Sequence, residues 1–89
     1  YGGVLKMRNK YTVKFKSKCP NDGEDIDYEA IITTHMMIMV EDIISFSKTF
    51  LIKPYYQEDI TQEFFDRFLC SVKTFGIHQG VKLECEIDS

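Results

Sequence analysis

Apolar and polar residues alternate along three stretches of the chain, and each of these stretches predicts a β-strand. The stretches are residues 11–16, 28–33 and 81–87, and the last is the most regular. A period of two turns successive side chains toward opposite faces of a strand, so that one face is buried and the other solvated. Residues 73–77 are predicted as a further short strand, which a tight turn at 78–80 joins to the last one. The apolar members of the three regular runs are Tyr11, Val13, Phe15, Tyr28, Ala30, Ile32, Val81, Leu83, Cys85 and Ile87.

A second pattern, with apolar residues three or four positions apart, occupies the middle of the chain and predicts two helices. The first spans roughly residues 41–50 and carries Glu41 and Asp42 in its first turn, where negative charge favours a helix N-terminus. The segment 53–56, which contains a proline, ends it. The second helix begins near Glu58, again with acidic residues first. Its apolar stripe is expected to comprise Ile60, Phe64, Phe65, Phe68, Leu69 and Val72.

The order of these elements, ββααββ, predicts an α+β fold. We expect one four-stranded antiparallel sheet with both helices on one face, in a single domain over residues 11–89 that follows an N-terminal extension of residues 1–10. A chain of 89 residues buries only ~60–65% of its unfolded surface, so its core is small. The two outer strands also leave backbone groups unpaired. Assembly of several subunits, with their sheets side by side in a barrel, would cover these edges and enlarge the buried area.

The composition indicates the redox compartment and argues against a metal site and a membrane span. The three cysteines include no pair in a CxxC arrangement, which favours a reducing compartment, the cytoplasm, over a disulfide scaffold. No spaced histidines and cysteines suggest a metal site, and none is expected. No apolar run is long enough to span a membrane and no signal-peptide pattern is present, so no membrane partner is expected either.

The charges are unevenly distributed along a chain whose formal net charge is −3. All 14 acidic residues follow Cys19, whereas the segment before it is purely basic. Two interpretations are open: a solvated strand face, or a basic stripe that contacts phosphate groups or a nucleic acid. The cations of this stripe are Lys6, Arg8, Lys10, Lys14, Lys16 and Lys18.

The segment between the first two predicted strands carries the candidate chemistry. Cys19 closes the first strand, Pro20 stops it, and the sequence through Gly23 is typical of a turn. Five acidic residues crowd the next ten positions. A thiol at a strand end, beside carboxylates, suits a nucleophile with a proton donor, and the alternative is a structural thiol. The other two thiols, Cys70 and Cys85, are expected in the core.

Three segments together resemble the enzymes that process the nitrile of 7-cyano-7-deazaguanine. Residues 19–24 (CPNDGE) resemble the Cys-Pro-x-Thr-Gly-Gln turn of that family, and residues 56–60 (YQEDI) resemble its aromatic-His-Glu-Asp segment. Residues 75–81 (FGIHQGV) are spaced like its Phe-x-x-Arg-Gly-Gly-Ile hairpin. The resemblance covers about residues 11–87. It implies the tunnelling fold (T-fold), in which ββααββ subunits form barrels with active sites between neighbouring subunits.

The resemblance also implies roles for individual residues. Cys19 would be the nucleophile that adds to the nitrile carbon and forms a covalent thioimide. Asp27 would protonate the nitrile nitrogen. This assignment assumes one inserted residue, because the family's aspartate lies one residue closer to its cysteine, and Asp25 is the alternative. Glu58 would bind the guanine-like edge of the substrate through its carboxylate. Glu41 and His78, which stands where the family has an arginine, complete the expected substrate-binding residues.

The branch of the family is predicted from what the sequence lacks. The reductases carry Glu-Ser-Lys-Ser-Leu-Lys for NADPH, and residues 41–46 read EDIISF, without either lysine. The sequence therefore resembles the amidinotransferase branch, which adds ammonia to the thioimide to give a formamidine and needs no cofactor. The alternatives are an NADPH-dependent reductase and a non-catalytic module that binds a purine or a pterin. The substrate is expected as a free base or as a base within tRNA or DNA.

Overall fold

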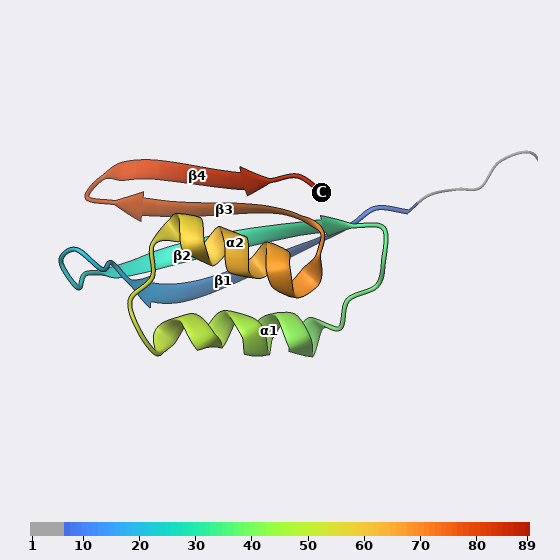
Figure 1. The fold of residues 1–89 in the computed structure, drawn as a ribbon, viewed down its shortest axis with the longest axis horizontal. Coiled ribbons are helices and arrows are strands. Elements are labelled where there is room, and N and C mark those ends of the chain that lie inside the picture. Colours follow the sequence, from blue (N-terminus) through green and yellow to red (C-terminus); the bar gives the residue numbers. More distant parts are fainter. Residues whose placement is uncertain (1–6) are drawn as a thin grey trace, which may run out of the picture.

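A computed structural model describes residues 7–89. They form one α+β domain, in which a layer of two helices packs on a four-stranded sheet. Its four strands form an antiparallel sheet in the order β1-β2-β3-β4, and both helices cover the same face of that sheet (Figure 1). The predicted α+β class and the order ββααββ are thus confirmed. The elements are β1 (Asn9–Lys18), β2 (Asp25–Thr34), α1 (Val40–Lys48), a 3₁₀ turn (Thr49–Leu51), α2 (Gln57–Phe68), β3 (Ser71–His78) and β4 (Val81–Ile87).

The strands are two-faced, as their alternation predicts. In β2 the buried side chains are Ile26, Tyr28, Ala30 and Ile32, and those between them are turned away from the helices. We call the side of the sheet that the helices cover the inner face and the other side the outer face. β1 begins at Asn9, two residues before the start of the predicted domain, and runs to Lys18, so the first hairpin is longer than its alternating core.

Aromatic rings fill the space between the sheet and the helices. Phe50 and Phe64 are fully buried and stack with their ring centroids 5.5 Å apart. Phe15 of β1 lies 5.6 Å from each of them, and Phe46 of α1 meets Phe64 edge-on at 5.0 Å. Separations of 4.5–7 Å in stacked and edge-on pairs are those that the aromatic quadrupole favours. These rings join α1, the 3₁₀ turn and α2 to one another and to β1.

The end of α2 differs from its prediction. The apolar stripe was expected to continue through Leu69 and Val72, but the helix ends at Phe68. Leu69 adopts a left-handed backbone conformation (φ 54°) and is 72% exposed, and the chain then reverses into β3. Val72 is buried on the inner face, opposite Ile32 of β2. The helix stops early because the chain must reverse before Ser71, where β3 begins to pair with β2.

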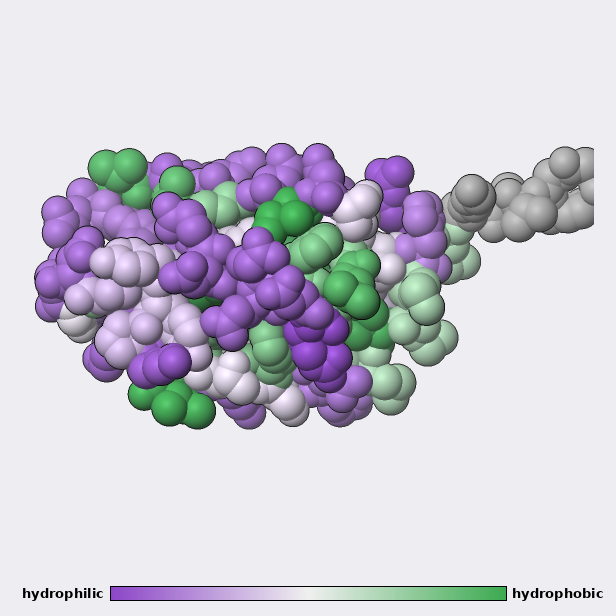
Figure 2. Space-filling model, in the orientation of Figure 1, coloured by the Kyte–Doolittle hydropathy of each residue, from purple (hydrophilic) through white to green (hydrophobic). Residues whose placement is uncertain are grey.

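The surface of the domain differs in polarity from place to place, and the sheet has two open edges. The face that carries the helices is largely hydrophilic, with separate apolar areas toward its ends (Figure 2). β1 and β4 are the two edges of the sheet, and within residues 7–89 neither has a second strand beside it. Over the same residues, no helix is both long enough and apolar enough to cross a membrane.

Candidate functional site

Cys19 lies directly after β1 and shares the inner side of the sheet with Phe15 and Ser17. Its side chain is half-buried and packs against the core. The turn that follows is tight: the Gly23 backbone N–H donates to the Cys19 carbonyl at 2.8 Å, and the Cys19 N–H donates to the Glu24 carbonyl at 2.9 Å. Gly23 has a φ of +73°, which glycine adopts without a steric penalty. The turn therefore holds the thiol at a fixed place beside the sheet.

Asp22 is the first carboxylate after Cys19 and belongs to the same turn. It accepts hydrogen bonds from the backbone N–H of Glu24 at 2.9 Å and from the side-chain amide of Gln79 at 3.1 Å. These two donors, in that order, lower the pKa of the Asp22 carboxyl, and the Cys19 thiol adds a smaller contribution in the same direction. The turn itself and the tip of the second hairpin thus both bind the Asp22 carboxylate.

The three segments on which the family resemblance rests meet at this end of the sheet. Gln79, at the tip of the β3–β4 hairpin, reaches Asp22 across 57 residues of sequence. The Tyr56 hydroxyl, just before α2, donates to the side chain of Asn21 at 3.2 Å, and the Tyr55 N–H donates to the Lys18 carbonyl at 3.2 Å. The sequence alone could not show this convergence, because it depends on how the two hairpins and α2 pack together.

A buried polar network links the start of α2 to β3 and β4. The Gln57 side chain is 1% exposed, and its amide donates to the Thr74 carbonyl and hydroxyl, both at 3.2 Å, and to the Leu83 carbonyl at 3.0 Å. Its oxygen accepts from His78 Nε2 at 2.8 Å. Thr61 donates to the Gln57 carbonyl and lies 2.7 Å from the Thr74 hydroxyl. Because every polar group of the Gln57 side chain has a partner, the network fixes both the helix start and His78.

Tyr28 lies beside this network and beside Cys19. Its ring packs between Phe15 at 5.5 Å and His78 at 5.7 Å. The residue is 2% exposed, yet its hydroxyl has no hydrogen-bond partner within the described residues, and the same is true of the buried Ser17 hydroxyl. Burial above all, and then the negative charge of ionised Cys19, Glu58 and Cys85, raises the pKa of Tyr28 to about 12. Two unpaired hydroxyls at one end of a core are unusual and mark this end as a place where a polar ligand group could be accommodated.

Gly76 on β3 makes room for this arrangement. A Cβ atom at this position would lie 2.6 Å and 2.7 Å from two ring carbons of Tyr28 and 2.8 Å from the Gln57 side-chain oxygen. A side chain here would displace both residues, so the glycine is a packing requirement of the site.

Glu58 belongs to the same end of the molecule. It is exposed in the first turn of α2, next to the buried Gln57. Its negative charge contributes to the raised pKa of both Tyr28 and Cys85, which shows that it acts on the same group of side chains. For Cys85 the largest cause of the raised pKa is burial. A hollow of about 430 Å³ adjoins this helix start and includes Pro20, Tyr56 and Asp59 among its lining residues.

The other predicted site residues lie elsewhere. Asp27 and Asp25 point to the outer face, where their carboxylates pair with Lys16 at 3.5 Å and Lys18 at 2.7 Å. Cys19 is on the opposite side of the sheet from both. Glu41 is exposed at the start of α1, at the far end of the domain from the Cys19 turn (Figure 1). Cys19, Glu58 and His78 are thus brought to one end of the domain, whereas Asp27 lies on the opposite face of the sheet and Glu41 at the far end.

Several residues of the site were not predicted as such. Gln57 was interpreted only as a replacement for the family's histidine, and Tyr28 and Thr74 only as strand residues. A polar residue on the inner face of a strand, as at Thr74, is the one signal that the sequence offered. Among residues 7–89, no three His, Cys, Asp or Glu side chains are grouped so as to hold a metal ion.

Comparison with known proteins yields no match, whether against family models, against curated proteins or against solved structures.

Proposed function

We propose that this chain is a nitrile-processing enzyme that acts on 7-cyano-7-deazaguanine, with Cys19 as its nucleophile. One observation carries the proposal. The Cys19 turn, the start of α2 and the β3–β4 hairpin, which together resemble the corresponding segments of that family, contact one another through the Gln79–Asp22 and Tyr56–Asn21 hydrogen bonds. Glu58 lies at the same helix start, where its carboxylate can accept hydrogen bonds from the ring N–H and the exocyclic amine of a guanine-like base.

The reaction begins at the thiol. The sulfur of Cys19 forms a bond to the nitrile carbon, one π bond of the nitrile opens, and its nitrogen takes up a proton to give a thioimide. Asp22 lies three residues after Cys19 in the same turn, and we assign to it the transfer of the thiol proton to the nitrile nitrogen. Within one subunit it is better situated for this transfer than Asp27, whose carboxylate faces the other side of the sheet.

Ammonia completes the proposed amidinotransfer. Its nitrogen adds to the thioimide carbon, the C–S bond breaks, and the sulfur of Cys19 leaves and regains a proton, which yields the formamidine. No redox cofactor takes part in this sequence. The absence of the reductase lysines from residues 41–46 favours this branch over reduction by NADPH.

The proposal includes a homo-oligomer. The unpaired edges of β1 and β4 can join neighbouring sheets, which would also enclose the exposed side of the candidate site. Light scattering coupled to size-exclusion chromatography tests this part, and a stable monomer at tens of micromolar protein would contradict it.

Intact-mass spectrometry tests the chemistry. After incubation with the free nitrile base, the wild type should gain the mass of one substrate per chain, and Cys19→Ala should gain none. Cys85→Ala is the matched control and should still form the adduct. With ammonia the adduct should turn over to the formamidine, without any loss of NADPH absorbance. An adduct that persists in Cys19→Ala, or no adduct in the wild type, would refute the nucleophile.

One observation favours a second candidate, a non-catalytic module that binds a purine or a pterin. Asp27, the acid that the resemblance implies, lies on the outer face and is paired with Lys16. Isothermal titration that detects tight binding of the base, together with no adduct and no product, would support this alternative.

A further inference from the structure

The basic stripe of the sequence, apart from Lys6, which lies outside the described residues, becomes a row on the outer face of β1 that begins at Arg8, one residue before the strand. Its cations occupy every second position of the strand, apart from Thr12, and all are exposed. Since a strand rises ~3.3–3.4 Å per residue, adjacent cations of such a row are ~6.7 Å apart. This spacing resembles that of successive phosphates along an extended single strand of nucleic acid. The described members of the row are Arg8, Lys10, Lys14, Lys16 and Lys18.

Not all of these charges are neutralised by acids of the protein. Lys16 and Lys18 are paired with Asp27 and Asp25 on β2. Arg8, Lys10 and Lys14 form no ion pair within residues 7–89. Three cations therefore remain available to phosphate groups, on a chain whose net charge is otherwise negative.

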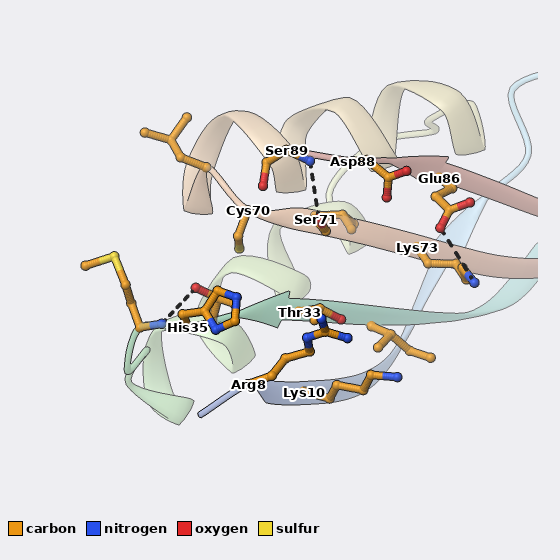
Figure 3. A pocket seen from close by; sticks show the side chains of 15 residues that line it. Arg8, Lys10, Thr33, His35, Cys70, Ser71, Lys73, Glu86, Asp88 and Ser89 are labelled. Carbon is orange, nitrogen blue, oxygen red and sulfur yellow. Dashed lines mark hydrogen bonds and ion pairs between the residues drawn. The ribbon is translucent and has the colours of Figure 1, made fainter. Parts of the chain in front are cut away.

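Two hollows lie beside this row, and they share Ile31 of β2. The first, of about 600 Å³, is bordered by Arg8, Lys10 and Lys73, with the hydroxyl of Thr33 between them (Figure 3). In Figure 3 the side chain of Arg8 extends over the sheet toward Thr33. Lys73 is already engaged by Glu84 and Glu86, each at 3.7 Å, so the free positive charge of the first hollow comes from Arg8 and Lys10, and Asp88 also borders it.

The second hollow, of about 670 Å³, has an apolar floor. Ile31, Phe75 and Ile77 line it, and Ile77 is 62% exposed. Lys14 borders this floor, and Lys82 lies over the Phe75 ring, with its ammonium 5.4 Å from the ring centre. Because a lysine side chain is flexible, Lys82 can move aside for a base to stack on Phe75, while its ammonium neutralises a nearby phosphate.

We propose that the outer face of the sheet binds a single-stranded nucleic acid. Its phosphates follow the β1 row at Arg8, Lys10 and Lys14, and a base stacks on Phe75. A duplex does not fit this surface, because its bases are already stacked and paired and offer no free π-face to Phe75. The inference is independent of the proposed nitrile chemistry, which uses the inner side of the sheet.

Fluorescence anisotropy with a labelled 12-nucleotide oligothymidylate, and with the same length of oligouridylate, tests this proposal. Three phosphate contacts give a log–log salt slope of about −2 for a single strand, so that raising the salt from 50 to 200 mM weakens binding by roughly 20-fold. Lys10→Ala together with Lys14→Ala should reduce the slope to about −0.7. Phe75→Leu keeps the floor apolar, removes the aromatic face and should weaken binding by about tenfold.

The matched control removes two cations from the other side of the molecule, Lys48→Ala with Arg67→Ala, and should leave affinity and slope unchanged. Circular dichroism verifies that each variant is folded. The proposal is overturned if neither oligonucleotide binds, if a duplex of the same length binds as tightly as the single strand, or if the control variant loses as much affinity as the β1 variant.

Discussion

Gly76→Ala tests the packing on which the candidate site depends. The backbone of Gly76 does not have a positive φ, so alanine suits its conformation, and only the added Cβ atom perturbs the structure. That atom would lie 2.6–2.8 Å from Tyr28 and Gln57. Neither neighbour can move freely, because the Tyr28 ring is held between two other rings and the Gln57 side chain by four hydrogen bonds.

The expected loss follows from two opposing terms. Overpacking of a filled core costs ~1–3 kcal/mol. Replacing glycine by alanine restricts the unfolded chain and returns ~0.4–1 kcal/mol. The free energy of unfolding should therefore fall by about 1–2 kcal/mol, which for a domain of this size lowers Tm by roughly 4–16 °C. Urea denaturation followed by circular dichroism measures the first quantity, and a thermal scan measures the second.

Gly23→Ala is the control for this experiment. Nothing lies within 4 Å of a Cβ atom at Gly23, so only the strain of its φ of +73° remains, at ~1–2 kcal/mol before the same unfolded-chain gain. The decisive result is the response of His78. Its ring resonances should shift in Gly76→Ala, because Tyr28 and Gln57 both contact it, and should stay in place in Gly23→Ala. A Gly76→Ala variant as stable as the wild type, with an unshifted His78, would refute the packing described above.

Three further predictions concern the same end of the core. Gln57→Leu removes four buried hydrogen bonds, three donated by the amide and one from His78 Nε2–H, and should cost about 2–4 kcal/mol in urea denaturation, whereas Gln62→Leu on the exposed side of α2 should cost under about 0.5 kcal/mol. Tyr28→Phe removes a buried hydroxyl that has no partner, so the unfolding free energy should stay equal or rise by up to about 1 kcal/mol; a clear loss would reveal a hidden partner. Because the pKa of Tyr28 is about 12 in the folded protein and about 10 in the unfolded chain, the unfolded chain releases this proton first, and stability should fall as the pH rises from 10 to 12. Denaturation across this range should show a smaller fall in Tyr28→Phe than in the wild type.

The order of the elements was predictable because the strands and turns of each hairpin have local sequence patterns. The alternation at 28–33 and 81–87 and the turn chemistry before β2 need no knowledge of the rest of the chain. The end of α2 was not predictable in this way. Val72 satisfies both the helical spacing from Phe68 and the period of two that it shares with Thr74, and no glycine or proline marks the stop. Pairing of Val72 with Ile32 of β2 places it in a strand rather than in the helix.

The site was predictable only in part, for a related reason. Cys19 and Glu58 stand in recognisable motifs, and the structure does bring them to one end. Whether Asp27 could join them depends on which face of β2 it occupies, and the predicted strand began only at Tyr28, whereas β2 begins at Asp25 and places Asp27 on the outer face. Gln57 could not be identified as the centre of a network, since its partners come from β3 and β4.

The topology also has a consequence for folding. β1–β2 and β3–β4 are hairpins with short connections, whereas β2 and β3 pair only after both helices intervene in the chain. Local pairs close at a small entropic cost, so the hairpins are expected to form early and to dock late. Cys19 belongs to the first hairpin and His78 to the second. An opening motion that separates the hairpins would therefore dismantle the candidate site while leaving each hairpin intact, and amide exchange should report this opening along β2 and β3.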